Sequence, residues 1–453
     1  MHLLINNVLL GKIKKQKMPP EKQTERHARL KTVSLIILGL IVFIAILSLI
    51  IYEGGNLAAG YYRNNHGLFA SKHIDDELDS VSEGDADVMR VVDSIGNHIN
   101  EAIKAGGVFD DKDKDVDSIL TTQLSATSTT ATSTSITNSD IQYVILSFDG
   151  SRSLEMWKET RQFAKDMAGQ GKPLHFTYFI NPIYLITKET AQKVYQPPRG
   201  KMGDSMIGYA DSEQDVKDRV EQINLAYNEG NEIGSHNVGH FNGSKWNYDE
   251  WLQESNSFDS IVNNVQKNNP NVLIQPWTFN LSEVAGFRAP ELGVNNDLYK
   301  VLGDKKYLYD SSGMRLPSKY PVKDKNGIWH IGLGIIKMKD LHSDPSGNGG
   351  SHYVLSMDYN FWMLQSHVKN VAKKGTPLWN NFYSEVKDSY LDYFNKNYEG
   401  NHAPVVIGHH FSLWNDGVYW DAMKSFAEDV CGKPKVKCVT FREYTDYLNS
   451  VVK

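Results

Sequence analysis

Runs of apolar and polar residues alternate along the last two thirds of the chain in a way that predicts strands and helices in turn. Continuous apolar runs bounded by turn residues are typical of buried strands, whereas apolar positions spaced three and four apart predict amphipathic helices. Strands that alternate with helices favour an α/β fold with a mainly parallel sheet, either a barrel or a doubly wound sheet. The predicted strands are 141–148, 174–180 and 231–236, and the predicted helices are 154–167 and 211–228.

A different hydrophobic pattern lies near the start of the chain, where Val33 to Tyr52 contain no charged residue. A helix of this length spans roughly 30 Å, the thickness of the hydrocarbon layer of a bilayer. The preceding residues 1–32 are rich in lysine and arginine. Because basic flanks stay on the cytoplasmic side, we expect a single-pass membrane protein with a cytoplasmic N-terminus and an extracytoplasmic remainder.

Two polar segments separate this apolar run from the predicted α/β domain. Residues 53–120 are acidic and polar with one weak amphipathic rhythm, and Thr121 to Asp140 form a tract rich in serine and threonine. Such compositions cannot form a core and are typical of stalks and extended linkers. The predicted organisation is a basic tail (1–32), a transmembrane helix (33–52), a flexible acidic stalk (53–120), a linker (121–140) and a catalytic domain (141–453).

Composition argues against a nucleic-acid partner, and the two cysteines predict a disulfide. The net charge of −6 gives no electrostatic reason to expect a nucleic acid as a partner, and nothing in the sequence indicates the oligomeric state. The chain has two cysteines, Cys431 and Cys438, which lie on the exported side of the predicted membrane helix. Since thiols outside the cytosol tend to oxidise, we expect them to form a local disulfide.

A pair of histidines follows the predicted strand at 231–236. His236 and His240 are four residues apart, so their imidazoles could bind one metal ion from a tight loop. Position 237 is Asn, which excludes the helical zinc-protease motif because that motif needs Glu there. The alternative is a pair of loop histidines that only form hydrogen bonds.

Three other chemical groups lie at or near the ends of predicted strands. Asp149 ends the first strand of the domain, which is where α/β barrels place catalytic groups. Arg288 follows a short apolar stretch and precedes Pro290, so it could point into a cleft. His409 and His410 end a strand together, and neighbouring side chains on a strand point to opposite faces. At most one of these two histidines should therefore face a given site.

These motifs, in this order, resemble the polysaccharide deacetylase domain of carbohydrate esterase family 4, which includes chitin and peptidoglycan deacetylases. The family's first motif, Thr-Phe-Asp-Asp-Gly, is matched by Ser147 to Gly150, and its His-x-x-x-His motif by His236 to His240. Its Arg-x-Pro motif is matched by 288–290, its Tyr-Asp-Ser-Ser segment by 309–312, and its last motif by 405–410. The resemblance implies a distorted (β/α) barrel and the removal of N-acetyl groups from a glycan polymer.

The sequence departs from the family at one position that matters for the metal. The family has two consecutive aspartates, the first a general base and the second a metal ligand, but here Gly150 follows Asp149. Asp149 could keep the role of base, or it could shift to bind the metal itself. Asp310, Asp358 or a water molecule could instead complete the ligand set.

The resemblance implies a mechanism and leaves two functional hypotheses. A divalent cation, Zn²⁺ for preference, would be bound by His236 and His240, with Asp149 as base, Arg288 as its orienting partner and His410 rather than His409 as acid. The first hypothesis is a metal-dependent N-deacetylase acting on an extracytoplasmic polysaccharide. The second is a degenerate fold that binds glycan without cleaving it. The candidate substrate contacts are Pro290, Trp414 and Trp329, although both indoles could equally belong to the core.

Overall fold

The computed structural model of the chain describes residues 140–338 and 352–452. The basic tail, the apolar run 33–52, the stalk and nearly all of the linker therefore lie outside the described residues. Within the two described ranges, no helix is both long enough and apolar enough to cross a membrane.

The predicted α/β class is confirmed, and the larger of two sheets is mainly parallel. Its strands run in the order β11-β1-β2-β3-β4-β5-β8-β7, and β12 lies off this path, paired with β1. The strands are β1 (Gln142–Asp149), β2 (Phe176–Ile180), β3 (Glu232–Ser235), β4 (Gly286–Phe287), β5 (Tyr309–Asp310), β7 (Val322–Lys323), β8 (Trp329–His330), β11 (Val405–His410) and β12 (Val436–Val439).

A smaller sheet lies beside β11, at one end of the main sheet. It contains β6 (Met314–Arg315), β9 (Leu333–Met338) and β10 (His352–Leu355). Ser356 joins it to the main sheet, because its N–H donates to Gly334 of β9 and its carbonyl accepts from Gly408 of β11. The carboxyl ends of β1, β3 and β11 thus lie around one common region, as they do in a barrel.

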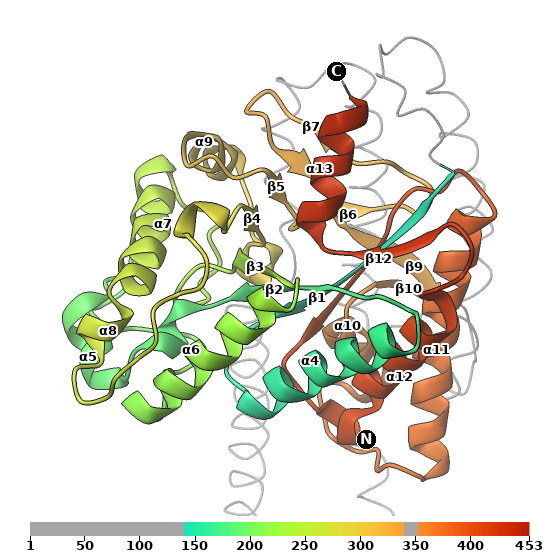
Figure 1. Cartoon of the computed structure of the whole chain (residues 1–453), viewed down its shortest axis with the longest axis horizontal. Coiled ribbons are helices and arrows are strands. Elements are labelled where there is room, and N and C mark those ends of the chain that lie inside the picture. The colour runs from blue at the N-terminus through green and yellow to red at the C-terminus, as the bar shows by residue number, and fades with distance from the viewer. Residues whose placement is uncertain (1–139, 339–351, 453) are drawn as a thin grey trace, which may run out of the picture. The chain divides into compact units, whose positions relative to one another are not determined.

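Helices lie around the outside of the main sheet (Figure 1). Their first residues follow ordinary capping rules: Ser153 caps α4, Ser212 caps α6, and Asn247 with Glu250 forms a capping box on α7. The helices are α4 (Leu154–Gly169), α5 (Lys188–Val194), α6 (Glu213–Asn228), α7 (Tyr248–Asn263), α8 (Val265–Asn268), α9 (Asn296–Asp304), α10 (Asp358–Ser366), α11 (Pro377–Tyr398), α12 (Trp414–Val430) and α13 (Phe441–Val451).

Side chains of β1 alternate between two buried regions, which explains its continuous apolar sequence. Leu146 and Phe148 pack against the core beneath the helices. Ile145 belongs instead to the interior cluster inside the curled sheet. Because side chains on a strand alternate, Ser147 and Asp149 share the interior face with Ile145. The strand therefore delivers one carboxylate to the carboxyl end of the sheet interior.

The predicted disulfide is confirmed between Cys431, just after α12, and Cys438 on β12. Their Cα atoms are 5.8 Å apart, and both side chains are buried. The bond closes a short loop, so it stabilises a local turn rather than the whole fold, by on the order of 2 kcal/mol.

Candidate active site

Asp149 and Arg288 form a buried ion pair at the end of β1. Arg288 Nη1 lies 2.6 Å from Asp149 Oδ1, and both side chains are almost entirely buried. Arg288 also donates to the hydroxyls of Ser147 and Ser311, and its guanidinium lies over the ring of Phe179. These contacts leave the guanidinium one orientation, so it fixes the direction of the Asp149 carboxylate.

The ion pair also controls the charge of Asp149. Burial alone raises the pKa of this carboxyl, but the Arg288 guanidinium offsets it, and His236 and His410 act in the same direction as Arg288. The net pKa is therefore below the ordinary value of 3.8. Asp149 is an anion at neutral pH, the state in which a carboxylate can accept a proton.

His236 and His240 lie together in the loop that follows β3. Their ring centroids are 5.0 Å apart at an interplanar angle of 72°. His236 Nδ1 donates to the carbonyl of Arg288 at 2.7 Å, which fixes the tautomer and leaves Nε2 with a free lone pair. Burial lowers the pKa of both imidazoles, that of His240 to about 3. Both rings are neutral at physiological pH, which is the state that binds a metal.

A buried carboxylate from α7 sets the shape of this loop. Glu254 is fully buried and accepts hydrogen bonds from the backbone N–H groups of Val238 and Gly239, between the two histidines. The hydroxyl of Tyr195 donates to the same carboxylate at 3.0 Å. Asn237 and His240 have positive φ angles of 53° and 62°, so the loop requires such support.

Replacing Glu254 with leucine should disturb the histidine pair, whereas glutamine should not. Leucine leaves two buried N–H groups without acceptors, at a cost of about 1–3 kcal/mol each. A glutamine side chain at this position keeps an oxygen that both N–H groups can reach. We expect Glu254→Leu to lower the melting temperature and to weaken zinc binding at least tenfold, and Glu254→Gln to stay within a few fold of wild type. Thermal unfolding and competition with a zinc-binding dye measure both effects, and equal behaviour of the two variants would show that Glu254 does not shape the loop.

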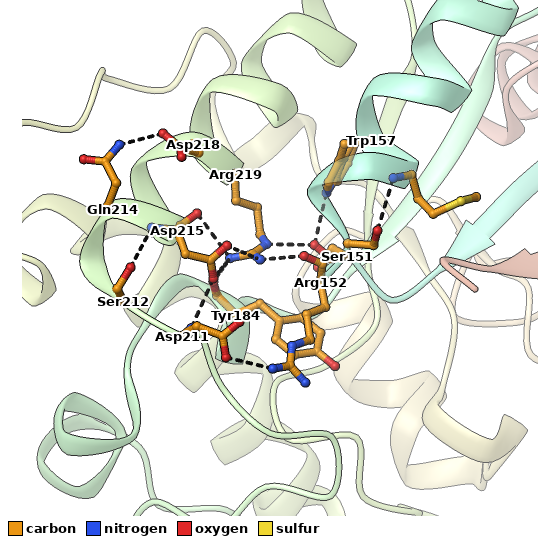
Figure 2. Close-up of polar contacts among 12 residues, drawn as sticks. Ser151, Arg152, Trp157, Tyr184, Asp211, Ser212, Gln214, Asp215, Asp218 and Arg219 are labelled. Carbon is orange, nitrogen blue, oxygen red and sulfur yellow. Dashed lines mark hydrogen bonds and ion pairs between the residues drawn. The ribbon is translucent and has the colours of Figure 1, made fainter. Parts of the chain in front are cut away.

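The loop after Asp149 is fixed in a similar way by Arg219 of α6 (Figure 2). This buried guanidinium donates to the carbonyls of Ser151, Arg152 and Tyr184. Its charge is balanced by Asp215, one helical turn earlier, at 2.9 Å. The backbone immediately following Asp149 and Gly150 is thus attached to a helix that no sequence motif connects with the site.

The two adjacent histidines of β11 point to opposite faces. His409 is buried under α11, and its Nε2 lies 2.9 Å from the hydroxyl of Tyr390. His410 points to the interior side, where its charge affects the pKa of Asp149 and of His240. Its side chain keeps 28% of its surface exposed. His410 is therefore the member of the pair that faces the other site residues.

Asp358, the first residue of α10, holds His410 in place. Its Oδ1 accepts from His410 Nδ1 at 2.7 Å, and its Oδ2 accepts from the backbone N–H of His410 at 2.8 Å. Burial alone lowers the pKa of His410, but the charge and hydrogen bond of Asp358 more than compensate, so the net pKa is raised above 6.5. Nε2 remains to carry a proton toward the site.

The three candidate substrate contacts have different environments. Trp414 is partly exposed, and its ring lies 5.3 Å from that of His410. Trp329 is buried in the interior cluster and donates its indole N–H to Asn449 of α13, so the structure favours the core interpretation for it. Pro290 is buried directly after Arg288 and Ala289, where it begins a short 3₁₀ turn.

A divalent cation fits the histidine pair, and the three carboxylates considered as a third ligand each have another partner. His236 and His240 offer two neutral imidazoles, the first with its tautomer fixed by a carbonyl as metal ligands commonly are. Asp149 pairs with Arg288 through Oδ1. The alternative ligands Asp310 and Asp358 bond to Ser312 and His410. Across residues 140–338 and 352–452, no group of three or more His, Cys, Asp and Glu side chains is arranged to hold a metal.

Sequence reasoning missed Glu254, Arg219 and the role of Asp358. Glu254 and Arg219 lie on helices, where a charged residue normally faces solvent. Asp358 appeared only as a possible metal ligand. A charged residue on the apolar face of a predicted helix was the one signal that could have identified the first two.

No protein-family model matches the chain, and no curated protein matches it. Several solved structures do match the chain. A Mycobacterium smegmatis protein assigned to the polysaccharide deacetylases is 14% identical, with a TM-score of 0.39 over 69% of this chain and 92% of its own. The peptidoglycan deacetylase PdaC of Bacillus subtilis is 12% identical, with a TM-score of 0.33 over 68% of this chain and 94% of its own.

A third similar structure is a pseudoenzyme of carbohydrate esterase family 4 from Bacillus anthracis. It is 9% identical, with a TM-score of 0.33 over 68% of this chain and 66% of its own. The first two structures carry the names of deacetylases, and the third carries the name of the family that the sequence motifs resemble. What these proteins cleave or bind is a property of those proteins.

Proposed function

We propose that this protein is a polysaccharide N-deacetylase whose domain is tethered to the outer face of a membrane by residues 33–52. The proposal rests on one observation: a carboxylate with a lowered pKa and an imidazole with a raised pKa lie at the same end of the sheet. Asp149, kept anionic by Arg288, and His410, whose pKa Asp358 raises above 6.5, act on one another's pKa at the carboxyl ends of β1 and β11. Titratable groups whose pKa values are pushed apart are what an acid–base hydrolysis needs.

The residues of the chain divide the reaction between them. Asp149 accepts a proton from water as that water attacks the carbonyl carbon of the N-acetyl group, and Arg288 keeps the carboxylate aimed. His410 Nε2 then donates its proton to the nitrogen as the carbon–nitrogen bond breaks, giving acetate and a free amine. A divalent cation at His236 and His240, when bound, supplies a Lewis acid that polarises the carbonyl and acidifies water.

Acetate release tests this proposal directly. The full-length chain in detergent should release acetate from N-acetylglucosamine oligomers, and both chelation and His240→Ala should reduce the rate at least a hundredfold. Adding Zn²⁺ back should restore the chelated wild type but not the variant. A wild-type protein that folds, binds zinc and yet releases no acetate from chitin, peptidoglycan or exopolysaccharide oligomers would exclude the proposal.

One observation favours a second function, glycan binding without cleavage. Gly150 replaces the second aspartate of the family motif, and the described residues contain no three-ligand metal group. On this hypothesis, oligomer binding persists when His236 and His240 are both replaced by alanine. On the enzyme hypothesis, the same double variant loses turnover. Calorimetry with the oligomer, together with an acetate assay, separates the two.

The enzyme proposal predicts a specific dependence of rate on pH. Because His410 must be protonated, kcat/KM should fall as the pH rises through the pKa of His410, which lies above 6.5. Because Asp149 must be ionised, kcat/KM should also fall in acid, at a pH below 3.8. Asp358→Asn removes the larger of the two charges that raise the pKa of His410, the other being Asp149. We expect the alkaline limb to move to lower pH in this variant. Asp324→Asn, which removes a carboxylate beside His330 instead, is the control, and an unmoved limb in Asp358→Asn contradicts the assignment of His410.

A further inference from the structure

A floor of three aromatic rings lies against the guanidinium of Arg288, inside the curled sheet. It consists of Phe179 of β2, Tyr309 of β5 and Phe441, the first residue of α13, and all three side chains are fully buried. The Cζ atom of Arg288 lies 4.4 Å from the ring centroid of Phe179 and 5.7 Å from that of Phe441. Tyr309 and Phe441 are stacked at 5.0 Å and 15°, and both meet Phe179 edge-on.

Two glycines leave the space that this aromatic floor occupies. A Cβ atom on Gly234 of β3 would lie 2.7 Å from the ring of Phe179, closer than real Cβ atoms approach their neighbours. A Cβ atom on Gly286 of β4 would overlap the hydroxyl group of Tyr309. Any larger residue at either position would therefore displace a ring, so the strands that lead into the site are built around the floor.

A buried carboxylate that takes no part in the proposed reaction holds Phe441 in the floor. The backbone N–H of Arg442 donates to Glu232 Oε2 at 2.9 Å, and that of Phe441 donates to the hydroxyl of Thr177 at 3.1 Å. Thr177 in turn donates to Glu232 at 2.8 Å, and the other oxygen of Glu232 accepts from the hydroxyl of Tyr309 at 2.8 Å. Free N–H groups and the dipole at a helix N-terminus favour an anion. Glu232 therefore anchors the start of α13 inside the sheet.

Hydrogen bonds alone resist a tilt of the Arg288 guanidinium only weakly. All its N–H donors lie in one plane, and Nη1 reaches Asp149 through a single bond to Oδ1. In-plane bonds fix the direction of the group, whereas contact with its face opposes a tilt out of the plane. Aromatic rings attract a guanidinium face and stack on it. A tilt would turn the Asp149 carboxylate with it, so the floor bears on the aim of the base.

We propose that Phe441 is a positioning residue for the deacetylation. Together with Phe179 it keeps the Arg288 guanidinium flat, and so keeps the Asp149 carboxylate aimed at the attacking water, while Glu232 holds Phe441 in place. The inference rests on the proposed function and adds the C-terminal helix α13 to the elements that the site needs. Because Phe441 acts through Arg288 rather than on the substrate, its loss should lower kcat and leave KM unchanged.

Kinetics of the full-length Phe441→Leu variant in detergent test this role. Leucine keeps an apolar side chain but offers no ring to the cation, so we expect about tenfold lower kcat for acetate release from N-acetylglucosamine oligomers, with KM within about twofold of wild type. Phe394→Leu is the matched control. Phe394 is also buried, stacks on Tyr398 and has the amine of Lys433 5.4 Å from its ring, but it belongs to the core beneath the helices. Its kcat should stay within about twofold of wild type.

A stability cycle tests the same contact without an activity assay. The double variant Asp149→Asn/Arg288→Met has no cation for Phe441 to contact. Phe441→Leu should therefore lower the melting temperature less in this background than in wild type, because mutations of residues in contact are not additive. Phe394→Leu should lower it equally in both backgrounds. Equal losses for Phe441→Leu as well would show that its ring does not act on the guanidinium.

Glu232→Gln is a second variant that keeps the shape of the side chain. The amide retains an oxygen for the hydroxyl of Tyr309 but turns a donor toward the N–H of Arg442, so the start of α13 loses its acceptor. We expect about fivefold lower kcat with KM unchanged. Glu385→Gln, at a buried carboxylate of α11 that accepts from Gln365, is its control. Should Phe441→Leu fail to fold, this pair carries the comparison.

The outcomes separate the positioning role from the deacetylase itself. A folded Phe441→Leu protein with wild-type kcat would overturn the role and leave the deacetylase standing. A higher KM at unchanged kcat would also overturn it, because it would show a loss of substrate binding instead. If wild type releases no acetate, the deacetylase fails, and the stability cycle then decides whether Phe441 holds Arg288.

Discussion

Replacing Asp149 with asparagine is expected to lower acetate release about 10³- to 10⁴-fold and to destabilise the domain at the same time. The rate falls because an amide cannot accept the proton of the attacking water. Stability falls because Arg288, 0% exposed, keeps its charge without a counterion. Breaking a buried ion pair from one side costs about 3–5 kcal/mol. Steady-state acetate release and thermal unfolding at neutral pH measure the two effects.

The double variant Asp149→Asn/Arg288→Met separates these effects. Replacing both members of a buried pair by uncharged groups is often close to neutral for stability, so most of the lost melting temperature should return while the activity stays lost. The pKa of Asp149 is lowered in the folded protein, so the stability it contributes is present at neutral pH and is lost as the pH falls through that pKa. Wild type and Asp149→Asn should therefore converge in acid. A single variant as stable as wild type at neutral pH would show that the pair does not stabilise the fold.

Placing an aspartate at position 150 is expected to strengthen metal binding at least tenfold. Gly150 has a φ angle of +79°, and a Cβ atom built there meets no atom within 4 Å, so a side chain has room. The family resemblance places a metal-binding carboxylate at this position. The left-handed conformation costs about 1–2 kcal/mol for a non-glycine residue, and aspartate tolerates it better than most. Zinc affinity by dye competition gives the measurement, and acetate release should rise with it.

Gly150→Ala provides the matched control for this variant. Alanine has a similar backbone cost to aspartate but offers no ligand, so it should lower the melting temperature without improving zinc affinity. A tighter site in Gly150→Asp alone would show that the histidine pair lacks an anionic ligand. Equal affinities in the two variants would show instead that position 150 does not face the pair.

Much of the fold could be predicted from neighbouring residues in the sequence. The apolar run that becomes β1, the capped helix α4 and the strand before His236 were all expected within a few residues of their observed bounds. The opposite orientation of His409 and His410 also followed from the two-residue period of a strand. These features depend on local backbone geometry, which is why a linear pattern predicts them.

The tertiary structure alone decided which side chains meet. Arg288 reaches Asp149 across 139 residues of chain, and Glu254 enters the histidine loop from the face of a helix. Trp329 and Trp414 looked alike in the sequence, yet one is in the core and the other lies beside His410. Such contacts depend on strand register and on the curvature of the sheet. Neither property is set by residues close in sequence. The sequence by itself therefore determined the helices, strands and motifs, whereas the packing of the sheet determined which side chains come together in the site.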